Sequence, residues 1–273
     1  MIDTHAHLTD RQFSTDLRDV ITRAQNAGVQ HIICVSESLS DARNVLRLSS
    51  EYERLLHPAV GLHPQYISSL SEDQLYSEMS EIRELIDKQS SVIAIGEVGL
   101  DFTPRVLSLA PSAEKAKHTQ RQIFDSFLEI AQRTGLPLTI HSRSAGHHAL
   151  TQVCEANAET PLTAIMHAFD GRPVYAVNAL KKMPESLYFS IPPSVVRSSS
   201  LPKLVRQAPL ERLLLESDAP ALPAVARERN EPKEVVKAVE MIAAVRSQRV
   251  DDVRQQLLYN TVRVFPSLAI NNP

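Results

Sequence analysis

Short apolar runs of strand length alternate with longer segments of helical period along almost the whole chain. Eight such runs begin near residues 1, 31, 55, 92, 136, 162, 187 and 211. Apolar runs of this length are typical of parallel strands that are buried on both faces, and the segments between them are typical of helical crossovers. The alternation predicts an α/β fold, and the count of eight favours a closed TIM (β/α)8 barrel.

The alternative to a barrel is an open, doubly wound sheet. A sheet of that kind that binds nucleotides carries a glycine-rich phosphate loop after its first strand. The chain has only seven glycines and contains neither G-x-G-x-x-G nor G-x-x-x-x-G-K, so dinucleotide and P-loop sites are excluded. No repeat or linker divides the sequence, and 273 residues suit one α/β barrel. We therefore expect a single domain over residues 1–273.

Charge and cysteine content limit the possible partners and compartment. The net charge is −3 and the pI is near 6.4, so any contact with nucleic acid must be local. Cys34 and Cys154 form neither a metal-binding spacing nor a disulfide framework, which favours a reducing compartment. No run approaches the roughly 20 apolar residues that cross a bilayer. We expect a cytoplasmic protein with no membrane segment.

Metal-binding residue types stand at the ends of five of the eight predicted strands. Glu97 follows the apolar run 92–95 after a single glycine, Gly96. His5 and His7 are two residues apart, so they project from one face of an extended segment. The carboxyl ends of all strands of a barrel meet at one face. One such residue alone could be a solvated polar group, but six placements of this kind are improbable by chance. The candidate metal ligands are His5, His7, Glu97, His141, His167 and Asp218.

Four imidazoles and two carboxylates are too many ligands for one tetrahedral ion. They suit two divalent ions that share a carboxylate. Glu97 is the expected bridge, with His5, His7 and Asp218 on one ion and His141 and His167 on the other. Imidazole ligands favour zinc, manganese, iron or nickel, whereas magnesium prefers oxygen ligands and is expected only as an activator.

Six motifs resemble those of TatD-type metal-dependent deoxyribonucleases. They occur in the order typical of that family, span nearly the whole chain, and are Asp3–Leu8, Gly61–Pro64, Ala94–Asp101, Leu138–Arg143, His167–Gly171 and Leu215–Pro220. Three further stretches resemble the subgroup called TatD DNase domain-containing protein 3, namely Asp101–Arg105, His141–Gly146 and Ser190–Ser194.

This resemblance implies a TIM barrel of the amidohydrolase superfamily with a dinuclear site on the six residues named above. It also implies hydrolysis of DNA phosphodiesters, often by trimming single strands from the 3′ end. Ser217 stands where the family usually has threonine, which is a minor change. Thr103 and Pro104 replace an aromatic stretch, so the resemblance predicts that a base-stacking surface is lost there.

The expected reaction is attack by a metal-activated hydroxide on a phosphodiester, with Glu97 and Asp218 as catalytic residues and Asp218 as general base. His63 follows the third strand and is a candidate contact to substrate. Arginines after strands four to eight could form a phosphate clamp, because guanidinium groups match phosphate oxygens in pairs. These are Arg105, Arg143, Arg172, Arg197, Arg227 and Arg229, with Arg143 nearest to a predicted ligand.

Two other functions are compatible with the same residues. The first is hydrolysis of a small phosphate ester, lactone or amide, which the same scaffold supports. Many such relatives bridge their ions with a modified lysine, whereas this chain has Glu97 at the end of strand four. The second is a binding protein with an inactive site. The expected partner is DNA, as single strands or 3′ ends, acted on by a monomer without a protein partner.

Overall fold

The computed structural model describes residues 1–268 and contains eight parallel strands in one sheet, ordered as they occur along the chain. An isolated parallel bridge joins Ala6 to Ala219, which brings the first and last strands together and nearly closes the barrel. The predicted eight-stranded barrel is confirmed. The strands are β1 (Ile2–Ala6), β2 (His31–Val35), β3 (Leu56–Val60), β4 (Ala94–Gly99), β5 (Leu138–His141), β6 (Ala164–Met166), β7 (Leu187–Ile191) and β8 (Leu213–Leu215).

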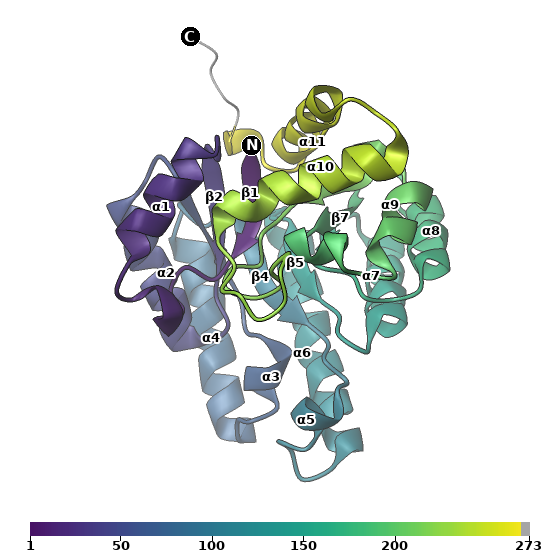
Figure 1. Cartoon of the computed structure of the whole chain (residues 1–273). Helices are drawn as coiled ribbons and strands as arrows, with labels where there is room; N and C mark the ends of the chain where they lie inside the picture. The colour runs from purple at the N-terminus through teal and green to yellow at the C-terminus, as the bar shows by residue number, and fades with distance from the viewer. Residues whose placement is uncertain (269–273) are drawn as a thin grey trace.

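Helices surround the strands (Figure 1). They are α1 (Leu17–Asn26), α2 (Leu39–Glu51), α3 (Pro64–Ile67), α4 (Glu72–Lys88), α5 (Pro104–Leu107), α6 (Ala113–Thr134), α7 (Gly146–Glu159), α8 (Pro173–Lys182), α9 (Leu201–Gln207), α10 (Val235–Arg246) and α11 (Val250–Val264). Short 3-10 helices lie at Arg11–Phe13, Pro193–Val196, Leu210–Arg212, Pro232–Glu234 and Pro266–Leu268. Serine side chains cap the two longest helices, Ser112 at α6 and Ser71, within a capping box, at α4.

One prediction about the loop after β4 is wrong. In the sequence, Pro104 and Pro111 predict that residues 102–112 form a loop without a regular helix, but helix α5 begins at Pro104. A proline is tolerated at the first helical position, where its missing N–H would have no intrahelical partner. Val106 is buried and anchors this short helix against the body of the protein.

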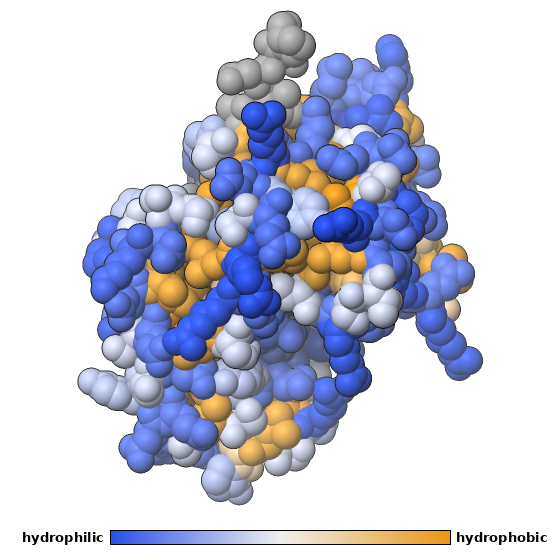
Figure 2. Space-filling view, turned by 90° about the vertical axis from the view of Figure 1, so that its left-hand side faces the viewer, coloured by the Kyte–Doolittle hydropathy of each residue, from blue (hydrophilic) through white to orange (hydrophobic). Residues whose placement is uncertain are grey.

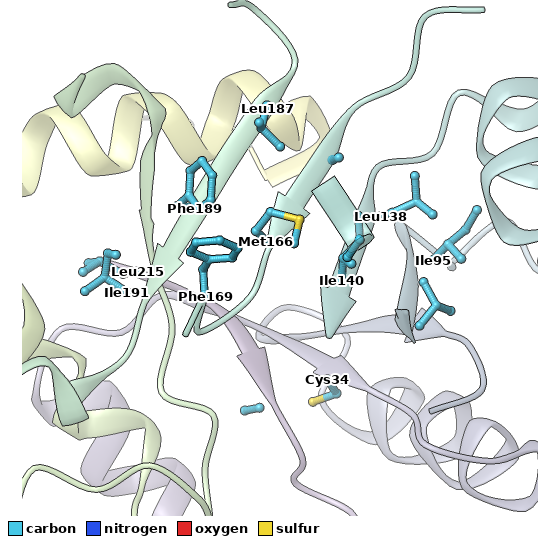
Figure 3. Close-up of a cluster of buried hydrophobic side chains, with 14 of the residues drawn as sticks. Cys34, Ile95, Leu138, Ile140, Met166, Phe169, Leu187, Phe189, Ile191 and Leu215 are labelled. Carbon is cyan, nitrogen blue, oxygen red and sulfur yellow. The ribbon is translucent and has the colours of Figure 1, made fainter. Parts of the chain in front are cut away.

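Two apolar clusters lie on the two sides of the barrel wall. The outer cluster packs strands against helices, and Figure 3 shows part of it around Met166, Phe169 and Phe189. The inner cluster draws residues from seven of the eight strands and therefore fills the barrel. Its strand members are Ile2, Ile33, Val35, Ala59, Ala94, Ile165, Tyr188 and Leu214, and Val264, Phe265 and Leu268 pack against them.

The outer surface is predominantly hydrophilic on the face seen in Figure 2, where apolar residues form small patches between polar ones. No helix within residues 1–268 combines the length and the apolar character needed to cross a membrane. The predicted single domain covers residues 1–273, of which 269–273 lie outside the described residues.

Candidate metal centre

Four of the six predicted ligands bring one donor atom each to a common point at the carboxyl ends of the strands. His5 Nε2 and His7 Nε2 are 3.3 Å apart and lie 3.4 and 3.3 Å from Glu97 Oε2. Asp218 Oδ1 lies 3.7 Å from His5 Nε2 and 3.4 Å from His7 Nε2. Ligands about 2.1 Å from a tetrahedral ion are about 3.4 Å from one another. His5, His7 and Glu97 therefore form one candidate metal-holding group, and Asp218 forms another with His5 and His167.

The other oxygen of Glu97 faces a second group of imidazoles. Glu97 Oε1 lies 2.7 Å from His141 Nδ1, 3.4 Å from His167 Nε2 and 3.8 Å from His63 Nε2. Glu97 thus offers one oxygen to each group, as a bridging carboxylate would. His63 was predicted only as a substrate contact, but His63, Glu97 and His141 form one of the candidate metal-holding groups. The assignment of individual residues to individual ions stays a prediction.

Local irregularities in two strands aim these ligands at the centre. The register of β1 against β2 shifts between Asp3 and Ala6, and the register of β4 against β5 shifts between Ile95 and Val98. Such bulges re-aim side chains and are common next to active sites. His5 and Glu97 lie within the shifted stretches and are almost wholly buried.

Two polar side chains that were not predicted as site residues hold the first strand in place. Asp3 Oδ1 accepts hydrogen bonds from the backbone N–H of His5 at 3.2 Å and of Ser217 at 2.8 Å, so it ties β1 to the loop after β8. Thr139 Oγ1 lies 2.8 Å from His5 Nδ1. A partner on the far ring nitrogen fixes the orientation of a ligating imidazole.

Two carboxylates support the imidazoles of the second group in the same way. Glu216 Oε2 lies 3.2 Å from His167 Nδ1 and also accepts a hydrogen bond from the hydroxyl of Ser190. Asp101 Oδ2 lies 3.3 Å from His141 Nε2, while its other oxygen accepts the backbone N–H of Thr103 at 2.8 Å. Both carboxylates stand in the same motifs as ligands, two residues before Asp218 and four after Glu97. Glu216 and Asp101 could have been predicted from the sequence, because each is an acidic residue close to a predicted ligand.

The electrostatics of the cluster favour ionised carboxylates. Burial alone would raise the pKa of Glu97, but the imidazoles of His63, His5 and His167 hold that pKa well below its ordinary value. Burial, followed by the proximity of His141, lowers the pKa of His63 to about 3, so His63 is neutral at physiological pH. A neutral imidazole beside a carboxylate can bind a cation but cannot act as a positive phosphate clamp.

Most of the candidate ligands line a cavity of about 660 Å³ that opens at the barrel mouth, namely His7, His63, Glu97, His141, His167 and Asp218. Arg105 and Arg143 also line it. The acidic residues Asp10, Glu37 and Asp41 line another part of the wall.

The remaining predicted arginines lie outside this cavity lining. Arg229 is bound by Asp16 at 2.6 Å and by Glu231 at 3.0 Å. Arg197 Nε donates to the carbonyl oxygen of Pro223 at 2.9 Å. Arg172 and Arg227 are exposed. The expected clamp is thus limited to Arg105 and Arg143 at the cavity itself.

Comparisons with known proteins identify the family and the fold. The family model described as TatD related DNase matches residues 2–266. The human protein named deoxyribonuclease TATDN3 is 36% identical over 98% of this chain and 95% of its own length. A Pantoea ananatis protein named 3'-5' ssDNA/RNA exonuclease TatD is 30% identical over 97% of this chain and 99% of its own. The crystal structure of YJJV, a TatD homologue from Escherichia coli, superposes with a TM-score of 0.84 at 27% identity, covering 97% of this chain and 98% of that one.

Proposed function

Because the chain belongs to the TatD-related DNase family, we propose that this metal-dependent hydrolase removes nucleotides from the 3′ ends of single-stranded DNA with two divalent ions. The membership confirms the resemblance seen in the motifs. The name of the Pantoea ananatis relative supports the choice of single strands and of the 3′ end.

The observation that carries the proposal is the position of Glu97 between two groups of donor atoms. One carboxylate oxygen lies 3.4 Å from His5 Nε2, and the other lies 2.7 Å from His141 Nδ1. A carboxylate shared in this way is typical of paired-ion hydrolases, in which the ions are about 3.5–4 Å apart. The nitrogen-rich ligand set favours zinc, manganese, iron or nickel, with magnesium as an activator.

The chemistry supplied by the cations when bound is a lowered pKa for a water molecule and polarisation of a phosphoryl oxygen. Asp218 faces the cavity and accepts the proton that the attacking water loses. Burial would raise the pKa of Asp218, but the charges of His167 and His5 and a hydrogen bond from His7 lower it, so the carboxylate is ionised at neutral pH. Arg105 and Arg143 neutralise the scissile phosphate from the cavity wall.

Digestion of a single-stranded oligonucleotide labelled at either end tests the activity and its direction. With a 5′ label we expect a ladder of shortened products, and with a 3′ label we expect immediate release of a labelled mononucleotide. Duplex DNA, RNA, p-nitrophenyl esters and lactones complete the panel. Turnover of the lactone or ester with no cleavage of any oligonucleotide would contradict the proposal.

The metal assignment is tested separately, by elemental analysis of protein purified without chelator. We expect at least one transition-metal ion for each chain. Protein that holds no transition metal yet cleaves DNA with added magnesium alone would refute the assignment.

A further inference from the structure

A row of aromatic rings and cationic groups crosses the rim of the barrel beside the metal centre. We call it the rim row. It starts at the segment after β4 and at α6, passes over the start of α7, and ends at the start of α8. Its rings are Phe102, His148, His147 and Tyr175, and its cations are Lys117, Arg121 and Arg172.

The rings of the row are in successive contact. The centroid of Phe102 lies 5.4 Å from that of His148, which lies 5.9 Å from that of His147. His147 stacks on Tyr175 with centroids 4.5 Å apart and ring planes 23° from parallel. The Arg121 guanidinium lies 5.5 Å from the Phe102 centroid, and that of Arg172 lies 5.9 Å from the Tyr175 centroid. The row is therefore continuous across three βα units.

Two glycines bring the starts of α7 and α8 close enough for this contact. A Cβ on Gly146 would lie 2.8 Å from Phe169 Cε2, and a Cβ on Gly171 would lie 2.4 Å from Phe169 Cζ. The buried Phe169 ring is thus packed against backbone from both segments (Figure 3 shows its place in the core). This close packing sets His147 and Tyr175 side by side.

The row is accessible and positively charged. His147, His148, Arg121 and Arg172 are exposed. Within residues 1–268, neither Arg121 nor Arg172 is held in an ion pair with a carboxylate, unlike Arg229 in the segment after β8, which is bound by Asp16. Burial lowers the pKa of His148, and Arg121 lowers it further, so this imidazole is a neutral flat ring at physiological pH.

The inner end of the row is tied to the metal centre. The backbone N–H of Phe102 donates to the carbonyl oxygen of Arg143 at 3.0 Å, and Arg143 lines the cavity. The residue before Phe102 is Asp101, whose carboxylate lies 3.3 Å from His141 Nε2. A single strand of DNA whose end lies in the cavity can therefore continue onto the rim row.

We propose that the rim row binds the part of a single-stranded DNA substrate that adjoins the nucleotide held in the cavity, with bases stacked on its rings and phosphates bound by Arg121 and Arg172. This inference rests on the proposed function and extends it to the substrate beyond the scissile bond. Flat rings beside cations bind single strands without sequence preference, because every base offers a face for stacking. The row supplies a stacking surface although Thr103 and Pro104 replace the aromatic stretch expected after Asp101.

Binding of a phosphorothioate oligonucleotide of about 12 nucleotides, which resists cleavage, tests the row in the metal-loaded enzyme. Loss of one stacking ring is expected to raise the dissociation constant about 5-fold to 100-fold. His147→Ala and Tyr175→Ala should each raise it by a factor in that range. Tyr175→Phe keeps the ring and should bind as the wild type does. Arg121→Ala and Arg172→Ala should each reduce the slope of log Kd against log salt concentration by about 0.7.

The controls separate binding by the row from damage to the metal centre. Tyr76→Ala removes an exposed tyrosine of α4, outside the row, and should change nothing. Turnover of bis(p-nitrophenyl) phosphate, which is too small to reach the row, should stay at the wild-type rate in every variant.

Three outcomes decide the matter. Less than a 2-fold change in Kd in folded His147→Ala and Arg172→Ala proteins overturns the proposal, as does a parallel fall in turnover of the small ester. If the expected binding losses occur although the wild type cleaves no oligonucleotide, the row stands as a single-strand site and the proposed nuclease activity fails.

Discussion

The two ends of the barrel are built from the same eight strands and have opposite chemistry. At the carboxyl ends, imidazoles and carboxylates surround Glu97 and line the cavity. At the amino ends, Phe265 and Leu268 pack on apolar residues inside the barrel, and Asn260 donates hydrogen bonds to the carbonyl oxygens of Leu210 and Leu213 at 2.8 and 2.9 Å. One end is arranged for chemistry and the other for stability, as is usual for this fold. Substitutions at the two ends should therefore affect different measurements.

The largest effect is expected for Glu97→Gln at the carboxyl end. The side chain keeps its shape but loses the charge that faces both groups of imidazoles. We expect kcat on oligonucleotides to fall about 10³-fold or more, equivalent to about 4 kcal/mol of transition-state stabilisation. The exposed Glu240→Gln on α10 is the matched control and should be fully active. Activity within 10-fold of the wild type would remove Glu97 from the centre of the mechanism.

The next largest effect belongs to the amino end. Phe265→Ala removes a ring that is 2% exposed from the inner apolar cluster. The free energy of unfolding should fall by about 3–5 kcal/mol, measured by denaturant titration. At a temperature where the variant is folded, its kcat should match the wild type. Tyr259→Ala, on the exposed side of α11, should leave stability almost unchanged. An equal loss of activity and stability in Phe265→Ala would break the separation of the two ends.

A smaller effect is expected for a carboxylate that contacts a predicted ligand on its far ring nitrogen. Glu216→Gln keeps the shape of the side chain but removes the charge beside His167 Nδ1. We expect a loss of about 10-fold to 100-fold in metal affinity, as is typical for such supporting carboxylates. Metal titration of the two proteins measures this loss directly. Unchanged affinity would mean that Ser190 and the backbone suffice to orient this part of the site.

The smallest effect concerns pH and the amino end. His57 Nε2 lies 3.0 Å from His31 Nδ1, and burial, followed by the proximity of His31, lowers the pKa of His57 to about 4. The unfolded chain binds a proton near pH 6.5, whereas the folded chain does not until about pH 4. Stability from this group is therefore complete above pH 6.5 and is lost as the pH falls toward 4. The wild type should lose about 2 kcal/mol more than His57→Gln over this range, measured by urea unfolding. Parallel curves would show that the pair is not shielded from water.

The strands could be predicted well from the sequence because buried parallel strands consist of continuous apolar runs. The runs near residues 31 and 187 coincide with β2 and β7 within one residue. The gathering of His5, Glu97 and Asp218 at one place followed from the barrel itself, since the topology decides which strand ends meet. The prediction for residues 102–112 was wrong because a proline can either end a helix or begin one. Here Pro104 begins α5, and the burial of Val106 favours that helix.

Contacts between side chains that are far apart in the sequence could not be predicted. Arg229 was expected in a phosphate clamp, but Asp16, 213 residues away, holds it in an ion pair. Glu216 reaches His167 only because β6 and β8 are separated by one strand in the closed sheet. The stack of His147 on Tyr175 depends on two glycines packing against one buried ring. Each of these features depends on distances between segments that local patterns do not contain.

In the described part of the chain, apolar residues fill the barrel behind Glu97, and the cavity opens at the barrel mouth. In the proposed exonuclease reaction, a released mononucleotide would therefore leave past Arg143 through the opening by which the next chain end enters. The two would compete for the same passage. We expect a mononucleotide to act as a competitive inhibitor, and turnover to slow as product accumulates even while polymer remains in excess.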